Sequence, residues 1–321
     1  RITVEVVDKT ANFLMSHAVQ DNLLVKEDGT PLTIGNVKRR ISMWLAAQGA
    51  ENPHGVIFAS GRDAGIPHSS GEEAGLLRQG ETIVFDIYPC EAGGGYHYDF
   101  TRTWCLGYAP DDVQELYTDV LTVYQQIMGE LRTGGLCRAY QEMTCELFEQ
   151  QGHMTIKSEP QTQEGYVHSL GHGLGLNIHE YPSFRLSSAN EHRLEPGVVV
   201  TIEPGLYYPE RNMGIRLEDT VVITENGCEV LSSAIPRTIE EIEALMKKDG
   251  MIQILKKADK YKGNLSLASR SLAPPGYSFH GIADFDVGQK GYGSLNFTGS
   301  FTKTEVFKKL DNLEYINIRY P

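Results

Sequence analysis

Acidic side chains stand inside apolar, strand-forming stretches of this 321-residue chain, where a carboxylate is costly to bury. Asp86 lies within "TIVFDIY", and Glu203 directly follows "VVVTI". Both stretches are rich in β-branched or aromatic residues, which predicts buried strands. A fold that buries such strands must give each carboxylate a cation or a hydrogen-bond donor. Several costly polar groups in this setting indicate a functional site.

The remaining pattern predicts a mixture of helices and hairpins. Apolar residues at helical spacing over residues 34–45 and 113–131 predict two amphipathic helices. Residues 82–88 and 96–104, separated by "EAGGG", predict a β-hairpin. Further strands are predicted at residues 198–202, 214–217 and 220–224. Helices that precede strands, together with antiparallel hairpins, favour the α+β class over a doubly wound parallel sheet.

Charge divides the chain near Ser233. Residues 1–232 hold 16 Lys and Arg against 32 Asp and Glu, whereas residues 233–321 hold 13 against 10. This shift predicts two domains with a boundary after residue 232. The net charge of −13 argues against a nucleic-acid partner, because phosphate neutralisation needs clustered basic residues. The chain begins with Arg1, which predicts further sequence upstream.

Other sequence features bear on location. No stretch approaches the roughly 20 apolar residues of a membrane span, and the start lacks a signal-peptide pattern. We therefore expect no membrane partner. The five cysteines are scattered without a C-x-x-C pair, which argues against a disulfide framework or a thiolate zinc site. These features predict a cytoplasmic protein.

Five potential metal ligands lie on or beside the predicted strands. Four carboxylates and one imidazole suit a pair of divalent first-row ions. The five are Asp86, Asp99, His172, Glu203 and Glu218. Two of them also have simpler interpretations, because Asp99 can form an ion pair with Arg102 and Glu218 one with Arg216.

Four motifs extend this interpretation: "FDIYPCEAGGGYHYDFTRTW", "VHSLGHGLGLNIHE", "TIEPGLY" and "GIRLEDTVVIT". They resemble the pita-bread metallopeptidases, in the aminopeptidase P and prolidase branch, over about residues 1–232. The resemblance implies a strongly curved antiparallel sheet covered by helices. It implies that Asp86 binds one ion alone, that Asp99 and Glu218 bridge both ions, and that His172 and Glu203 complete the other. Asp86 and Asp99 are 13 residues apart where the family commonly has 11, so we expect a bulge at the hairpin turn.

The resemblance also implies an activity: hydrolysis of the Xaa-Pro bond at the N-terminus of peptides with proline at the second position. Two ions, Mn²⁺ first and Co²⁺, Zn²⁺ or Fe²⁺ as alternatives, would hold the hydroxide nucleophile between them. Glu203 would shuttle its proton. His68, His168 and His179 would stabilise the oxyanion or orient the leaving group, and Arg216 would help to bind substrate. A homodimer is common in the resembled family.

Alternatives of two kinds remain at this stage. Within the family, the chain is also compatible with a prolidase, which cleaves Xaa-Pro dipeptides, or with a methionine aminopeptidase. The "TRT" after Asp99, His168 before His172 and Arg216 favour the proline-specific branch. The non-enzyme alternative is a catalytically inactive pita-bread binding module, although such relatives typically lack ligands that this chain retains.

Residues 233–321, after the predicted boundary, contain two further sequence patterns. Residues 238–260 have helical spacing, which predicts a connector helix. The segment "APPGYSFHGIADFDVGQ" resembles the first zinc motif of D-alanyl-D-alanine carboxypeptidases, with Ser278, His280 and Asp286 near the matching positions. One His and one Asp lack the third protein ligand of catalytic zinc sites, so we expect an incomplete, inactive appendage. The alternative is an unrelated loop-rich segment.

Overall fold

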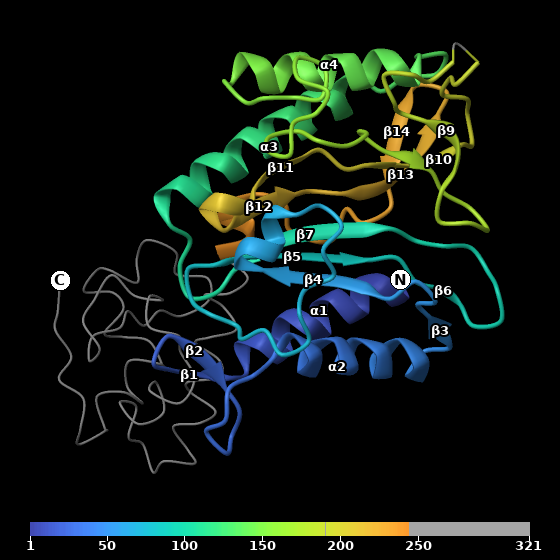
Figure 1. Ribbon diagram of the computed structural model, residues 1–321. Coiled ribbons are helices and arrows are strands. Elements are labelled where there is room, and N and C mark those ends of the chain that lie inside the picture. The colour runs from blue at the N-terminus through green and yellow to red at the C-terminus, as the bar shows by residue number, and fades with distance from the viewer. Residues whose placement is uncertain (190, 244–321) are drawn as a thin grey trace, which may run out of the picture.

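The computed structural model describes residues 1–189 and 191–243 of the chain (Figure 1). Its helices are α1 Ile2–Met15, α2 Ile34–Ala47, α3 Asp111–Glu130 and α4 Cys137–Gln150, with 3₁₀ turns η1 Gly61–Gly65 and η2 Pro209–Arg211. Its strands are β1 Ala18–Gln20, β2 Leu23–Val25, β3 Ala50–Glu51, β4 Val56–Ser60, β5 Thr82–Ile87, β6 Cys90–Glu91, β7 Phe100–Cys105, β8 His172–Gly173, β9 Glu180–Ser183, β10 Val199–Ile202, β11 Gly205–Tyr208, β12 Met213–Arg216, β13 Asp219–Thr224 and β14 Gly227–Val230.

The carboxypeptidase-like tail lies outside the described residues. This holds for Ser278, His280 and Asp286, and for most of the connector helix predicted over 238–260. No helix among the described residues is long and apolar enough to span a bilayer.

Local sequence explains where the two predicted helices begin. The Thr33 hydroxyl accepts a hydrogen bond from the Asn36 N–H at 3.2 Å, and Asn36 Oδ1 accepts one from the Thr33 N–H at 3.1 Å. This capping box satisfies donors at the start of α2. In α3, Asp111 and Asp112 place negative charge in the first turn, where the helix dipole favours it. The prediction omitted α1 and α4.

Antiparallel pairing builds the sheets, which confirms the predicted α+β class. Strands β5 and β7 pair from Thr82 opposite Cys105 to Ile87 opposite Phe100, as the predicted hairpin requires, and β4 adds to the other edge of β5. A five-stranded sheet has the order β14-β13-β10-β8-β9. Strands β11 and β12 form a separate hairpin.

The tip of the β5–β7 hairpin leaves the ladder between Ile87 and Phe100. There β6 pairs instead with β3, and Gly93 and Gly94 take positive φ angles of 91° and 92°. Glycine adopts this conformation without the penalty that a Cβ would bring. The His97 N–H donates to the Gly175 carbonyl at 2.8 Å, so the tip reaches the glycine-rich loop. The two residues by which this connection exceeds the expected spacing therefore fit at the hairpin tip, outside the β5–β7 ladder.

Two buried clusters divide the molecule into halves. The first half comprises α1, α2 and β4, β5 and β7, with Val37 and Phe85 fully buried between them. The second half comprises α3, α4 and β8–β14, with Val120 and Val200 fully buried. Figure 1 shows α1 and α2 on one side of the strands and α3 and α4 on the other. An antiparallel bridge between Thr101 and Glu218 joins the two halves.

The chain continues to pack against these halves beyond residue 232. Ile235 is buried with the first cluster, and Ile239 and Ile242 pack against the second. Arg237 forms an ion pair with Asp219 at 2.6 Å. The boundary after residue 232 stays a prediction, and residues 233–242 contact the core of the described region.

Candidate metal centre

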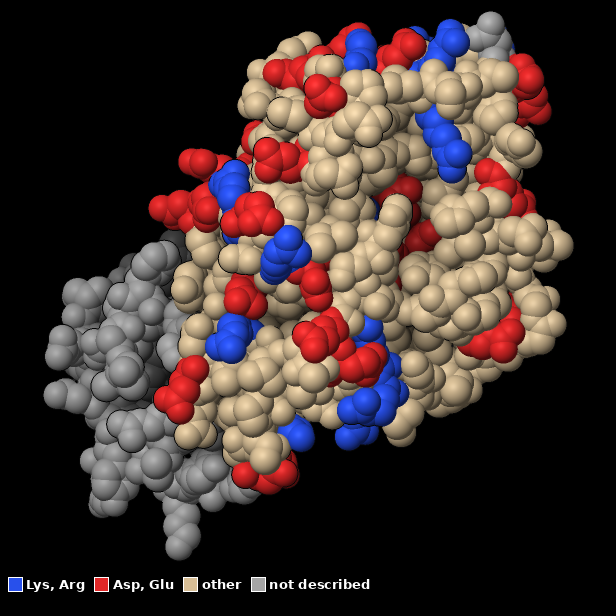
Figure 2. Space-filling view, in the orientation of Figure 1, with Lys and Arg blue, Asp and Glu red and all other residues tan. Residues whose placement is uncertain are grey.

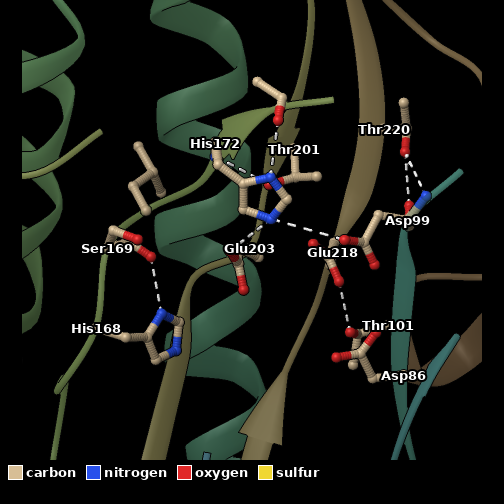
Figure 3. Close-up of polar contacts among 12 residues, drawn as sticks. Asp86, Asp99, Thr101, His168, Ser169, His172, Thr201, Glu203, Glu218 and Thr220 are labelled. Carbon is tan, nitrogen blue, oxygen red and sulfur yellow. Dashed lines mark hydrogen bonds and ion pairs between the residues drawn. The ribbon is translucent and has the colours of Figure 1, made fainter. Parts of the chain in front are cut away.

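The five predicted ligands lie where the two halves meet. Asp86 is in β5, Asp99 immediately precedes β7, His172 is in β8, Glu203 follows β10, and Glu218 lies between β12 and β13. Ligand atoms of Asp99, His172 and Glu218 lie within 4.8 Å of one another. His172 Nε2 is 3.6 Å from Asp99 Oδ2 and 3.7 Å from Glu203 Oε1. Figure 3 shows these side chains pointing toward one another.

His172 offers an unshared electron pair to this space. Its Nδ1 lies 3.1 Å from the Gly173 carbonyl oxygen, so this nitrogen carries the proton and donates it. The other nitrogen, Nε2, therefore faces the carboxylates as an acceptor. Burial lowers the pKa of His172 to about 4, which keeps the ring neutral at pH 7. An ionised carboxylate that faces this acceptor is stabilised only when a cation or a proton lies between the two groups.

The carboxylates show the same lack of compensation. Burial, with the charges of Asp86 and Glu203, raises the pKa of Asp99 well above its usual range. Burial and the Asp99 charge do the same for the pKa of Glu218, and burial raises the pKa of Glu203 to about 8. Asp86 Oδ1 is buried without a hydrogen-bond partner among residues 1–189 and 191–243. Four such carboxylates and one neutral imidazole fit a pair of divalent cations.

A chain of buried contacts runs from Asp86 to His168. Arg216 Nη2 donates to Asp86 Oδ2 at 2.6 Å, and Nη1 donates to the Tyr207 hydroxyl at 2.8 Å. The Tyr207 hydroxyl lies 2.9 Å from His168 Nε2. The simple ion pair considered for Glu218 and Arg216 is therefore replaced by one between Arg216 and Asp86. Arg216 is only 3% exposed and its guanidinium holds Asp86, and its role in substrate binding stays a prediction.

Threonine hydroxyls fix the two predicted bridging residues, Glu218 and Asp99. Thr101 Oγ1 donates to Glu218 Oε2 at 2.6 Å. The Thr220 hydroxyl donates to the Asp99 carbonyl at 2.6 Å, and the Asp99 N–H lies 3.2 Å from the same hydroxyl (Figure 3). These contacts orient the ligands and leave Asp99 Oδ2 facing His172.

Asp99 does not form the ion pair with Arg102 that its sequence allowed. Arg102 Nη2 donates instead to Asp219 Oδ1 at 2.9 Å, and both side chains are fully buried. Asp99 Oδ1 accepts a hydrogen bond from the Phe100 N–H at 3.0 Å. The simpler interpretation of Asp99 is thus wrong for the described residues.

Of the three predicted catalytic histidines, His179 contacts a predicted ligand, whereas His68 and His168 line a cleft whose walls include none of the five ligands. The His179 ring lies 4.4 Å from the His172 ring in an edge-to-face arrangement. His68 and His168 line an open cleft of about 620 Å³. Burial lowers the pKa of His168 to about 3, and burial also lowers the pKa of His179. The His168 and His179 rings are therefore neutral at pH 7, and in His168 the Ser169 carbonyl and the Tyr207 hydroxyl occupy the two nitrogens.

Sequence reasoning missed three residues that support the site. Tyr207 lies in "TIEPGLYY", and nothing in that pattern distinguishes it from an ordinary core tyrosine. Thr101 and Arg102 lie in "DFTRT", which signals the family but assigned them no role. Figure 2 shows acidic atoms recessed in a hollow on one face of the molecule.

Comparisons with known proteins place this site in a family. The model of metallopeptidase family M24 matches residues 14–225. A Xaa-Pro dipeptidase of Pyrococcus furiosus is 33% identical over 197 residues, which cover 61% of this chain and 52% of that protein. The chain thus spans about half the length of this curated relative.

Solved structures agree with this match. The X-Pro aminopeptidase of Thermotoga maritima is 26% identical with a TM-score of 0.59, over 73% of this chain and 60% of that one. The prolidase of Pyrococcus horikoshii is 25% identical with a TM-score of 0.60, over 74% and 61%. The predicted pita-bread fold is confirmed by these likenesses and the family match. The chain belongs to metallopeptidase family M24.

Proposed function

We propose that this protein is a dinuclear-metal peptidase that cleaves the Xaa-Pro bond at the N-terminus of peptides. The observation that carries the proposal is the neutral His172 Nε2 facing Asp99 and Glu203 at 3.6 and 3.7 Å. Such an arrangement of acceptors suits cations at its centre. The names of the relatives support the substrate class.

The proposed ligands divide between two ions. Asp86 would hold one, His172 and Glu203 the other, and Asp99 and Glu218 would contact both. When bound, two divalent ions supply Lewis acidity and make water acidic enough to act as a nucleophile near neutral pH. We propose Mn²⁺ as the ion, with Co²⁺, Zn²⁺ and Fe²⁺ as alternatives, because this mixture of oxygen and nitrogen donors accepts all four.

The chain's own residues then have separate tasks. Glu203 would accept a proton from the nucleophile and return it to the leaving nitrogen, a role that the position of its buried carboxylate beside His172 supports. His179, beside His172, is placed to donate to a developing oxyanion or to orient the leaving group. His68 and His168 line the cleft that would receive substrate. Arg216 holds Asp86 in its orientation through their ion pair.

Prolidase activity is the second candidate. The relatives include proteins named Xaa-Pro dipeptidase and prolidase as well as an X-Pro aminopeptidase. We also propose a cytoplasmic location, which five free cysteines support, and a homodimer, which the resemblance to the family supports.

A chelator and add-back assay tests the function. The protein is stripped with a chelator, and each metal is then added with Xaa-Pro dipeptides and with longer Xaa-Pro peptides as substrates. We expect activity only with metal, and higher kcat/KM on the longer peptides. Glu203→Gln should lower kcat by about 10²- to 10⁴-fold, the scale of a positioned acid-base group. Cleavage that survives complete metal removal, or a fully active Glu203→Gln variant, would refute the proposal.

A further inference from the structure

A buried ion-pair network lies directly behind the predicted ligands. Asp219 follows Glu218 in the chain and is fully buried. Its Oδ1 accepts a hydrogen bond from Arg102 Nη2 at 2.9 Å. Its Oδ2 accepts from the Tyr124 hydroxyl and from Arg237 Nε, both at 2.6 Å. A carboxylate with this many donors stays ionised inside the protein, and these donors, Arg102 first among them, lower the pKa of Asp219 despite its burial.

Arg102 connects Asp219 to the backbone of the metal centre. Its Nη1 donates to the carbonyl oxygens of Glu218 at 2.8 Å and Thr101 at 2.9 Å. Its guanidinium lies 4.3 Å from the centroid of the Phe100 ring, and Phe100 directly follows Asp99. Arg102 therefore contacts the chain beside both carboxylates that are expected to bridge the ions.

The network is also connected to Glu203, another predicted carboxylate ligand. Asp219 pairs with Ile202 in the β10–β13 ladder, and Glu203 is the residue after Ile202. A displacement of Asp219 would thus shift the positions of Glu203 and Glu218. Asp219 and Arg102 reach the predicted ligand segments through strand pairing and a backbone carbonyl, so their effect on bound ions would be indirect.

Arg237 closes the network from outside. It lies after β14, and its side chain is 20% exposed while that of Asp219 is fully buried. The Tyr117 hydroxyl donates to the Arg237 carbonyl at 2.8 Å, and Arg102 Nε donates to the neighbouring Pro236 carbonyl at 3.0 Å. Three contacts therefore fix this segment against the back of the metal centre.

We propose that Arg237 is a positioning residue that raises the affinity of the metal centre for divalent ions by holding Asp219 in place. Asp219 and Arg102 in turn fix the backbone of Glu218. The inference rests on the proposed function, because it requires that the five ligands bind metal. Hydrogen-bond partners behind metal ligands typically change metal affinity by about 10- to 100-fold.

The test measures metal affinity in the full chain, by isothermal titration with Mn²⁺ as the probe. Arg237→Gln removes the charge at a partly exposed position and leaves Asp219 paired with Arg102, so the fold should persist. We expect its Kd for Mn²⁺ to rise about tenfold. Arg237→Lys restores a cation near Asp219 and should stay closer to the parent. The matched control is Arg132→Gln, since the exposed Arg132 side chain forms an ion pair with exposed Glu130, and its Kd should not change.

A second variant protects the test against misfolding. Tyr117→Phe deletes the hydrogen bond to the Arg237 carbonyl without changing any charge, and should raise the Kd by a smaller factor, about threefold. Co²⁺ absorption spectra of each variant report the ligand geometry independently of peptide cleavage. An unchanged Mn²⁺ Kd and Co²⁺ spectrum in both variants, with the parent binding metal and cleaving peptide, would overturn this inference alone. A parent protein that binds no divalent ion would overturn the proposed function with it.

Discussion

His172 and His168 are four residues apart, yet their surroundings give them different tasks. The Nε2 atom of His172 faces Asp99 and Glu203, whereas the Nε2 atom of His168 faces the Tyr207 hydroxyl. Both nitrogens of His168 are engaged by protein groups, because Nδ1 also lies 2.8 Å from the Ser169 carbonyl. Only His172 has a nitrogen available for an ion.

Alanine variants separate these tasks. His172→Ala should raise the Mn²⁺ Kd by at least about tenfold, because a ligand is lost. His168→Ala should leave the Kd within about twofold of the parent and lower kcat by about 10²- to 10⁴-fold. Titration calorimetry and steady-state kinetics on a Xaa-Pro peptide measure the two quantities, with His17→Ala as a remote control. Loss of metal from His168→Ala would instead make that residue a ligand.

This dependence on surroundings also explains which site residues could be predicted from the sequence. Asp86 and Glu203 could be predicted because a carboxylate in an apolar strand is expensive and needs a reason. Tyr207 could not, because a tyrosine beside an apolar strand is a common core residue. Its role depends on Arg216, from the paired strand β12, and on His168, 39 residues earlier in the chain.

Close packing at Gly171 positions the strand that carries His172. A Cβ atom at Gly171 would overlap the Thr201 carbonyl oxygen on the neighbouring strand β10. At Gly129 in α3, by contrast, a Cβ atom would meet nothing. Alanine substitutions at these two glycines should therefore change the stability of the fold in opposite directions.

We expect Gly171→Ala to destabilise the fold by about 1–3 kcal/mol, the usual cost of overpacking, and to weaken Mn²⁺ binding by moving β8 away from β10. Gly129→Ala should stabilise it by about 0.5–1 kcal/mol, because alanine restricts the unfolded chain and favours helix. Urea denaturation of the metal-free proteins measures both changes. A stable Gly171→Ala variant with parental affinity would show that β8 tolerates displacement.

The length of a strand decides whether it could be predicted from its sequence pattern. The β5–β7 hairpin was predictable, since each strand is six residues long and rich in β-branched or aromatic side chains. Strand β8 has only two residues, His172 and Gly173, and its place is set by the pairing of Gly173 with Val200. Two residues show no periodicity, so the sequence gives no signal for this strand.

The stability of the whole molecule should depend on metal and pH together. Burial raises the pKa of Glu203 to about 8, and burial with neighbouring charge raises the pKa of Asp99 and Glu218. Between pH 6.5 and 8 the metal-free folded state therefore holds protons that the unfolded state has released, and stability is lost as pH rises. His172, with a lowered pKa of about 4, loses its proton below this window.

Scanning fluorimetry with and without saturating Mn²⁺ checks this dependence. The Tm of chelated protein should fall from pH 6.5 to 8. The increase in Tm that Mn²⁺ produces should grow over the same range, because protons and ions compete for the same oxygens. A chelated Tm that rises with pH, or a Mn²⁺ increment that shrinks, would contradict the burial of uncompensated carboxylates.

The ligands come from both halves of the molecule, and each half has its own hydrophobic core. Asp86 and Asp99 belong to the sheet covered by α1 and α2, while His172 and Glu203 belong to the sheet covered by α3 and α4. A cation held by both sets would be a non-covalent cross-link between two separately packed units. The Arg102–Asp219 and Arg216–Asp86 ion pairs and the Thr101–Glu218 bridge would still connect the units without it, so a metal-depleted molecule would loosen first at the contact between its halves, before either core unfolds.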